Sequence, residues 1–149
     1  MFVFFKPYNL KTEEIALKLE STSEGDPEKN WAPAYYFDIC NPQGVKMGAI
    51  DLRLGYNEFL YYAGNIGYTI LPEFRGHHYA GKACRLIFDL ARKHGMKEII
   101  ITCNPDNIAS AKTCEAVGGV LERIVELPQD NPMRIDKGET HKCIYRVKL

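Results

Sequence analysis

The sequence lacks an excess of charge of either sign, a long apolar run and a metal-binding cysteine pattern. Its 149 residues include 19 Lys plus Arg and 19 Asp plus Glu, so the formal net charge is zero. A neutral chain gives no support for binding to nucleic acid or to a membrane surface. No stretch approaches the length of a membrane-spanning helix, and the apolar start, Met1–Phe5, is too short for a signal-peptide core. We therefore expect neither a nucleic-acid partner nor a membrane partner.

The cysteines are odd in number and form no CxxC pair. This pattern argues against a disulfide framework and against a zinc site, so we expect no metal ligands. A reducing cytoplasm is the simplest location for such a chain. The cysteines are Cys40, Cys84, Cys103, Cys114 and Cys143.

The length and composition are those of an ordinary globular protein. Hydrophobic residues make up 46% of the chain and charged residues 26%. A chain of this size can build one hydrophobic core, so we predict a single domain over residues 1–149. The sequence leaves homodimerisation open.

The first half of the chain predicts mainly strands. A short strand is expected over Met1–Phe5, and Thr12 is a candidate cap for a helix with Glu13 and Glu14 in its first turn. The stretch from 21 to 34 is rich in turn-forming residues and is expected to be a loop. Short turns then separate three strand-like runs, which predicts an antiparallel meander. These runs are Tyr35–Cys40, Val45–Arg53 and Phe59–Leu71, the last with an irregularity at Gly64 and Asn65.

The second half alternates helices and strands. Apolar residues recur at helical spacing from Tyr79 to His94, and the β-branched run within Glu98–Cys103 predicts a strand buried on both faces. The remaining expected elements are a helix over Asn107–Val117 and strands over Val120–Leu127 and Thr140–Lys148. This order predicts an α+β fold with one mixed, mostly antiparallel sheet flanked by helices.

A possible phosphate site lies between Leu71 and Ala83. In this segment a strand ends, a short loop containing Gly76 turns, and a helix containing Gly81 begins. The start of a helix presents unpaired N–H groups and the positive end of the helix dipole, and small residues allow a ligand to approach the backbone. The same features are also compatible with a simple tight turn between a strand and a helix.

These residues resemble the GNAT acetyltransferase superfamily. The family's phosphate loop carries Arg or Gln, two variable residues, Gly, a variable residue, and Gly or Ala. That pattern falls on Arg75, Gly76, His77, His78, Tyr79 and Ala80. The upstream segment Ile66–Pro72 resembles the family's fourth strand. The downstream segments Asn107–Ser110 and Cys114–Gly118 resemble its second ligand-binding helix.

The resemblance implies a cofactor site. Acetyl-coenzyme A is the expected co-substrate, bound between splayed parallel strands four (Tyr68–Ile70) and five (Ile99–Cys103). The backbone of the fourth strand would align the pantetheine arm, and the loop after it would hold the pyrophosphate. Asn107 would contact the cofactor by its side chain, although Asn is also a good helix cap. The residues implied are Tyr68, Thr69, Ile70, Arg75, Gly76, His77, His78, Tyr79, Ala80, Gly81 and Asn107.

The sequence departs from the family pattern at three positions. His78 stands where the loop usually has glycine, and Gly119 stands where an aromatic residue often follows. Cys114 stands where many members have a tyrosine that protonates the leaving thiolate. A thiol can donate a proton, so Cys114 is the candidate catalytic acid; a small buried hydrophobic residue is the alternative interpretation.

The general base and the acceptor site are less well defined. Thr102 lies where some members have a glutamate, and the nearest carboxylates, Asp51, Glu58 and Glu73, are expected to be solvated surface charges. Several aromatic residues are candidates either for lining the acceptor pocket or for packing in the sheet. They are Phe59, Tyr61, Tyr62 and Tyr68.

Two classes of function remain open from the sequence. The first is an N-acetyltransferase acting on a primary amine of a small molecule or, as the second choice, of a protein N-terminus. The second is a non-catalytic module that binds acyl-coenzyme A as a sensor or partner domain.

Overall fold

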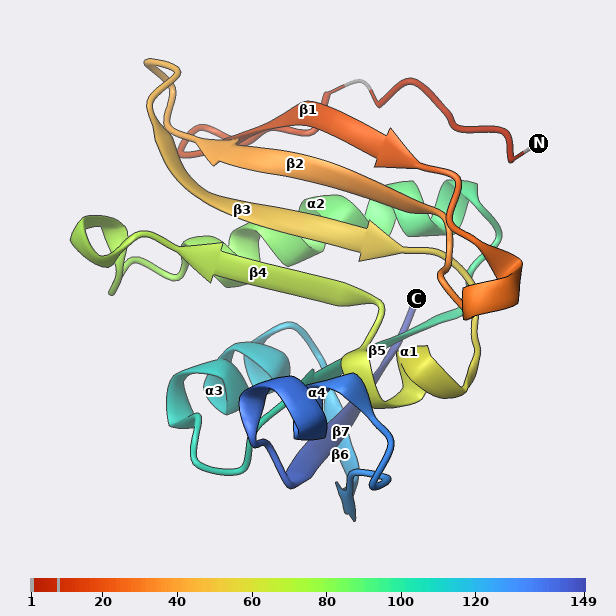
Figure 1. The fold of residues 1–149 in the computed structure, drawn as a ribbon. Helices are drawn as coiled ribbons and strands as arrows, with labels where there is room; N and C mark the ends of the chain where they lie inside the picture. The colour runs from red at the N-terminus through yellow and green to blue at the C-terminus, as the bar shows by residue number, and fades with distance from the viewer. Residues whose placement is uncertain (1, 8) are drawn as a thin grey trace.

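Two antiparallel half-sheets form the framework of the chain (Figure 1). The computed structural model describes residues 2–7 and 9–149. The first half-sheet has the order β1-β2-β3-β4 and the second has the order β5-β7-β6. The strands are β1 (Ala16–Ser23), β2 (Ala34–Cys40), β3 (Lys46–Arg53), β4 (Ile66–Ile70), β5 (Glu98–Cys103), β6 (Val120–Glu126) and β7 (His141–Lys148). The helices are η1 (Pro27–Lys29), α1 (Glu58–Ala63), η2 (Pro72–Phe74), α2 (Tyr79–Lys93), α3 (Ile108–Ala116) and α4 (Pro132–Lys137).

The α+β class and the splayed pair of central strands are confirmed. In Figure 1, β4 and β5 run in the same general direction, and they meet where β4 begins. The backbone N–H of Asn65 donates to the carbonyl of Ile100 at 2.7 Å, and no strand ladder joins β4 to β5 beyond this point in the described residues. The single sheet expected from the sequence is therefore divided into two halves.

The main core lies between the first half-sheet and α2, which covers its rear face in Figure 1. Alternate residues of β2 point into this core, with Tyr35, Phe37 and Ile39 all at most 1% exposed. From α2, Cys84 and Ile87 are fully buried against them. Each such apolar side chain contributes roughly 1.5–3 kcal/mol when removed from water, so this interface fixes the helix on the sheet.

The prediction for the N-terminal region was wrong. Residues 2–5 form no strand, and Met1 lies outside the described residues. The hydroxyl of Thr12 accepts hydrogen bonds from the N–H groups of Glu14 and Ile15, as a cap would, but no helix follows. The chain then continues as β1, which pairs with β2 and extends into the expected loop as far as Ser23. Pairing with β2 satisfies the backbone along β1, which outweighs the local preference for a helix.

The prediction of a strand over Phe59–Leu71 was also wrong in its first half, where α1 forms. Asn57 caps α1 there, because its Oδ1 accepts a hydrogen bond of 2.8 Å from the N–H of Leu60. Gly64, with φ of +84°, ends the helix. The irregularity noted at Gly64 and Asn65 is thus the boundary between a helix and a strand.

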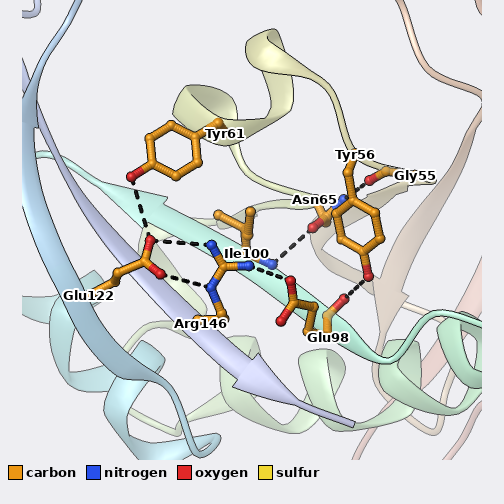
Figure 2. Close-up of polar contacts among 8 residues, drawn as sticks. All are labelled: Gly55, Tyr56, Tyr61, Asn65, Glu98, Ile100, Glu122 and Arg146. Carbon is orange, nitrogen blue, oxygen red and sulfur yellow. Dashed lines mark hydrogen bonds and ion pairs between the residues drawn. The ribbon is translucent and has the colours of Figure 1, made fainter.

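Asn65 joins the two half-sheets through its side chain (Figure 2). This fully buried residue accepts a hydrogen bond of 2.8 Å from the N–H of Ile100 on β5. Its amide donates to the carbonyls of Arg53 at 3.0 Å and Gly55 at 2.8 Å. One side chain therefore bonds the end of β3, the turn that follows it and the middle of β5.

We expect Asn65→Ala to lower the free energy of unfolding by at least ~3 kcal/mol, because it leaves several buried backbone groups without partners. Asn65→Asp should also destabilise, since it keeps the acceptor for Ile100 but loses both donors. Asn57→Ala is the control, because it removes a helix cap, worth about 1 kcal/mol, and one exposed hydrogen bond to the carbonyl of Asn30. Urea unfolding followed by circular dichroism measures all three, and an Asn65→Ala cost no larger than that of the control would contradict this role.

Candidate functional site

The free edge of β4 forms one wall of the candidate site. Tyr68, Thr69 and Ile70 pair with β3 on one side only. Their other side faces the gap that opens between β4 and β5, where no described strand pairs with them. An unpaired strand edge can bind an extended ligand as an added strand. These three residues thus form a free strand edge, and their role in aligning a pantetheine arm stays a prediction.

The loop after β4 brings the predicted phosphate residues to the start of α2. Nε of Arg75 donates to the carbonyl of Ile70 at 2.9 Å and closes the loop. Gly76 has φ of +91° and His78 has φ of +61°. His78 therefore adopts the left-handed conformation that a glycine would take at this position. The side chain of His78 makes no capping hydrogen bond, so it does not occupy the first N–H groups of α2.

Gly81 has a packing role as well. A Cβ atom there would lie 3.6 Å from Cγ1 of Val117 and 4.0 Å from Cγ2 of Thr113. A methyl group would therefore only make van der Waals contact with α3 and its cap, whereas a side chain larger than alanine would press the two helices apart. His77, Tyr79 and Ala80 complete the loop and the first turn of α2.

Asn107 caps α3. Its Oδ1 accepts a hydrogen bond of 3.1 Å from the N–H of Ser110. The capping role is confirmed, and the contact between Asn107 and the cofactor stays a prediction.

Cys114 lies inside the protein rather than at the surface of the gap. It is fully buried, and the hydrogen bond that it shares with Cys103, together with burial, raises the pKa of its thiol well above the usual range. The same hydrogen bond lowers the pKa of Cys103. Burial favours a packing role for Cys114, and its proposed action as an acid stays a prediction.

The side chain of Tyr68 was missed as a candidate proton donor. Its hydroxyl lies 2.7 Å from Oγ of Ser110, which is one turn before Cys114 on α3. Burial raises the pKa of Tyr68 above the ordinary tyrosine value, so the hydroxyl keeps its proton throughout the neutral range. The alternating direction of side chains in β4 was the signal that could have pointed Tyr68 toward α3.

The aromatic residues expected around an acceptor pocket separate into two groups. Tyr68 contacts α3 and the core, whereas Tyr61 and Tyr62 lie on α1 with ring centroids 5.4 Å apart. Phe59 lines a cavity of about 220 Å³ together with Trp31 and Tyr36. Sequence reasoning did not connect Trp31 to this site, because more than twenty residues separate it from Phe59.

A charged cluster covers the outer face of the second half-sheet (Figure 2). The guanidinium of Arg146 binds both carboxylate oxygens of Glu122, at 3.1 and 3.2 Å, and also pairs with Glu98. The hydroxyl of Tyr61 reaches Glu122 at 3.5 Å. These hydrogen bonds from Arg146 lower the pKa of Glu122, which makes it a weak base. Thr102 is also engaged, because its hydroxyl donates to the carbonyl of Tyr62 at 2.8 Å.

Asp51 differs from the surface charge that the sequence predicted. Its side chain is only 19% exposed and pairs with Nε of Arg53 at 2.9 Å. Burial raises the pKa of this carboxyl, and the nearby Arg53 opposes the rise. Glu58 and Glu73 are exposed, as expected.

Comparison with known proteins identifies the family of this chain. The family described as the Acetyltransferase (GNAT) domain matches residues 2–120. The chain belongs to the GNAT acetyltransferase family. The segment that resembles the family's phosphate loop thus lies between an edge strand and the start of a helix.

Several solved GNAT structures resemble the chain in fold. An acetyltransferase from Bacillus anthracis is 20% identical with a TM-score of 0.60, and the match covers 76% of this chain and 65% of that one. The ribosomal-protein-S5-alanine acetyltransferase of Vibrio fischeri is also 20% identical at a TM-score of 0.60, with coverage of 82% and 64%. The microcin C7 self-immunity acetyltransferase MccE, in complex with acetyl-CoA and AMP, is 20% identical with a TM-score of 0.60. That match covers 78% of this chain and 61% of MccE. The chain therefore spans less than two thirds of each of these proteins.

The curated relatives include a much longer protein. The chain is 27% identical to the protein translocase subunit SecA of Francisella philomiragia over 136 residues, which covers 89% of this chain and 14% of the relative. The chain thus spans about one seventh of that protein. Among the described residues of this GNAT domain, none of the helices combines the length and apolar character needed to cross a bilayer.

The thiols offer a direct test of this site. Burial raises the pKa of Cys84 to about 12, and Cys114 is also raised, whereas Cys103 is lowered. Since the thiolate is the reactive form, we expect iodoacetamide at pH 8 to modify Cys103 before Cys84 and Cys114 in the native protein. Peptide mass spectrometry over a time course measures the order, with urea-unfolded protein as the control in which all thiols react. Faster labelling of Cys114 than of Cys103 would contradict this arrangement.

Proposed function

We propose that this chain transfers the acetyl group of acetyl-coenzyme A to a primary amine. The observation that carries the proposal is the free edge of β4 leading directly into the start of α2, in a member of the GNAT family. The strand edge suits the pantetheine amides, and the helix start suits the pyrophosphate. The relative MccE is described in complex with acetyl-CoA, which supports the same co-substrate here.

Each part of the site has a role in this reaction. Backbone N–H groups of Gly76 to Gly81 bind the pyrophosphate, and Asn107 contacts the cofactor beside them. Backbone groups of Tyr68, Thr69 and Ile70 hold the arm so that the thioester lies in the gap between β4 and β5. An N–H group on the edge of β4 then stabilises the negative charge that develops on the thioester carbonyl oxygen. The departing thiolate takes a proton from the side of α3.

We favour a small molecule over a protein N-terminus as the amine acceptor. The small cavity beside Phe59, with its aromatic walls, supports this choice. Relatives of similar fold include the Vibrio fischeri enzyme, described as acting on an alanine of ribosomal protein S5, and a spermidine N-acetyltransferase chimera. Both kinds of amine therefore belong in the test. A cytoplasmic location and a homodimer stay predictions.

Acetyl-coenzyme A should raise the thermal midpoint of the protein, because it binds the folded state. We expect Gly76→Pro to abolish this rise, since proline cannot adopt a positive φ and lacks the N–H donor. Ala80→Glu should do the same by placing a negative charge beside the phosphates. Lys93→Glu, at the opposite end of α2, is the control and should respond like the wild type. Normal responses from both loop variants would remove this loop from the cofactor site.

Two side chains are candidates for protonating the leaving thiolate. Because Cys114 is fully buried and the Tyr68 hydroxyl reaches Ser110, we expect Tyr68→Phe to lower kcat by about 100-fold, at the low end for general acid catalysis. Cys114→Ala should lower stability but keep turnover per folded molecule. Release of free coenzyme A, normalised to folded protein, measures both. A lower kcat for Cys114→Ala with unchanged acetyl-coenzyme A affinity would instead establish the thiol as the acid.

The same assay distinguishes an enzyme from a binding module. A thermal shift with acetyl-coenzyme A, without turnover on any amine tested, would establish the non-catalytic alternative. The replacement of the family's tyrosine by a buried cysteine is the feature that favours that alternative.

A further inference from the structure

Asp51 places a half-buried carboxylate on the outer face of β3, away from α2. It lies opposite Gly67 of β4 in the strand register. Nε of Arg53 contacts Oδ2 of Asp51 at 2.9 Å, and Nη1 of Arg53 donates to the carbonyls of Ala63 and Gly64 at 3.1 Å each. Arg53 is thus held by the end of α1, and it fixes one carboxylate oxygen of Asp51.

The other carboxylate oxygen of Asp51 lies against β4. A Cβ atom on Gly67 would be 2.7 Å from Oδ1 of Asp51 and 2.8 Å from Nη2 of Arg53. The absence of a side chain at Gly67 therefore lets the ion pair cover the backbone of β4. β4 itself borders the gap that faces β5, so Asp51 on β3 lies one strand spacing, about 4.8 Å, behind this edge. Asp51 consequently lies beside the proposed position of the thioester, on the face opposite to α3.

Asp51 is the best-placed base among the described carboxylates around this gap. Glu98 and Glu122 are both paired with Arg146. Asp38, diagonal to Asp51 on β2, pairs with Lys46 at 3.2 Å. The groups that face Asp51 are Arg53 on its own strand, Tyr36 opposite it on β2 and the Asp38–Lys46 pair beyond, while β4 presents Gly67 and Thr69.

The neighbouring cavity has aromatic side chains in its wall and lies next to the Asp51–Arg53 ion pair, through Arg53. Its volume is about 220 Å³, and Trp31, Tyr36, Phe59 and Arg53 contribute to its wall. The ammonium of Lys29 lies over the ring of Trp31, with Nζ 4.7 Å from the ring centroid. Aromatic faces attract ammonium groups, and a carboxylate close by adds a charged hydrogen-bond acceptor.

We propose that Asp51 binds the ammonium group of the acceptor and takes up its proton, so that the acceptor is a small cationic amine held by the wall of this cavity. The inference rests on the proposed acetyl transfer. The ammonium gives one proton to the Asp51 carboxylate and becomes a neutral amine, whose lone pair attacks the thioester carbon. The C–N bond forms and the C–S bond breaks, the leaving thiolate takes a proton from the donor on the α3 side, and the second amine proton restores that donor, giving the amide and free coenzyme A. Asp51 then releases its proton to solvent.

Steady-state kinetics with acetyl-coenzyme A and three probe amines test the proposal: spermidine, phenethylamine and a short peptide that begins with alanine. We expect Asp51→Asn to lower kcat at neutral pH by about 100-fold with at least one small amine. The deficit should shrink as pH rises, because solution then supplies the neutral amine that Asp51 no longer generates. Asp38→Asn is the matched control, being a carboxylate of similar burial on the same face, and it should keep wild-type kinetics.

A second variant tests whether the position of the Asp51 carboxylate matters when the carboxylate itself is kept. Gly67→Ala keeps Asp51 but displaces the ends of the Asp51 and Arg53 side chains, so it should also lower kcat while the protein remains folded. The thermal shift with acetyl-coenzyme A should stay normal in both variants, which a general loss of structure would not allow.

Three outcomes would overturn the proposal. Wild-type kcat in Asp51→Asn would show that the carboxylate is not the base. A loss by the same factor at every pH would show that Asp51 serves only to position Arg53. Activity of the wild type on the peptide alone would exclude a small amine acceptor. If the wild type acetylates none of the three amines, the proposed function itself fails, which is a separate result.

Discussion

The hydrogen bonds of Asn65 are the constraint on which the rest of the structure depends. A buried amide is costly unless its donors and acceptor are all used, and Asn65 uses them to bond Arg53, Gly55 and Ile100. The two half-sheets share no other ladder in the described residues. The side chain and the backbone N–H of Asn65 therefore hold the start of β4 against β5, and the strands separate beyond this point.

The separation of these strands creates the site. Because β4 pairs only with β3 after Asn65, its other edge keeps backbone groups available for a ligand. β4 ends directly at the loop that starts α2, and α2 lies close to α3 at Gly81. The start of α2 and the N-terminus of α3 thus both lie at the open end of the gap between β4 and β5.

Charge is distributed differently on the two sides of this gap. Toward α3, two groups keep their protons: burial raises the pKa of Tyr68, and the hydrogen bond with Cys103 together with burial raises the pKa of Cys114. On the outer face, Arg146 pairs with two carboxylates, and Arg53 leaves one oxygen of Asp51 directed at Gly67. Protonated hydroxyl and thiol groups on one side and a carboxylate on the other suit a reaction in which a cation must lose a proton before it attacks and an anion must gain one when it leaves.

The sequence by itself determined the elements whose signals are local. The apolar stripe of α2, the isoleucine run of β5 and the loop from Arg75 to Gly81 each lie within a few neighbouring residues, and the structure contains them as expected. Only the tertiary structure decided that the segment after Thr12 becomes β1 rather than a helix, because its backbone bonds with β2 outweigh a local cap. It alone also brought Asp51 over Gly67 and the Tyr68 hydroxyl to Ser110, since burial and ion pairing depend on strands that meet only after folding.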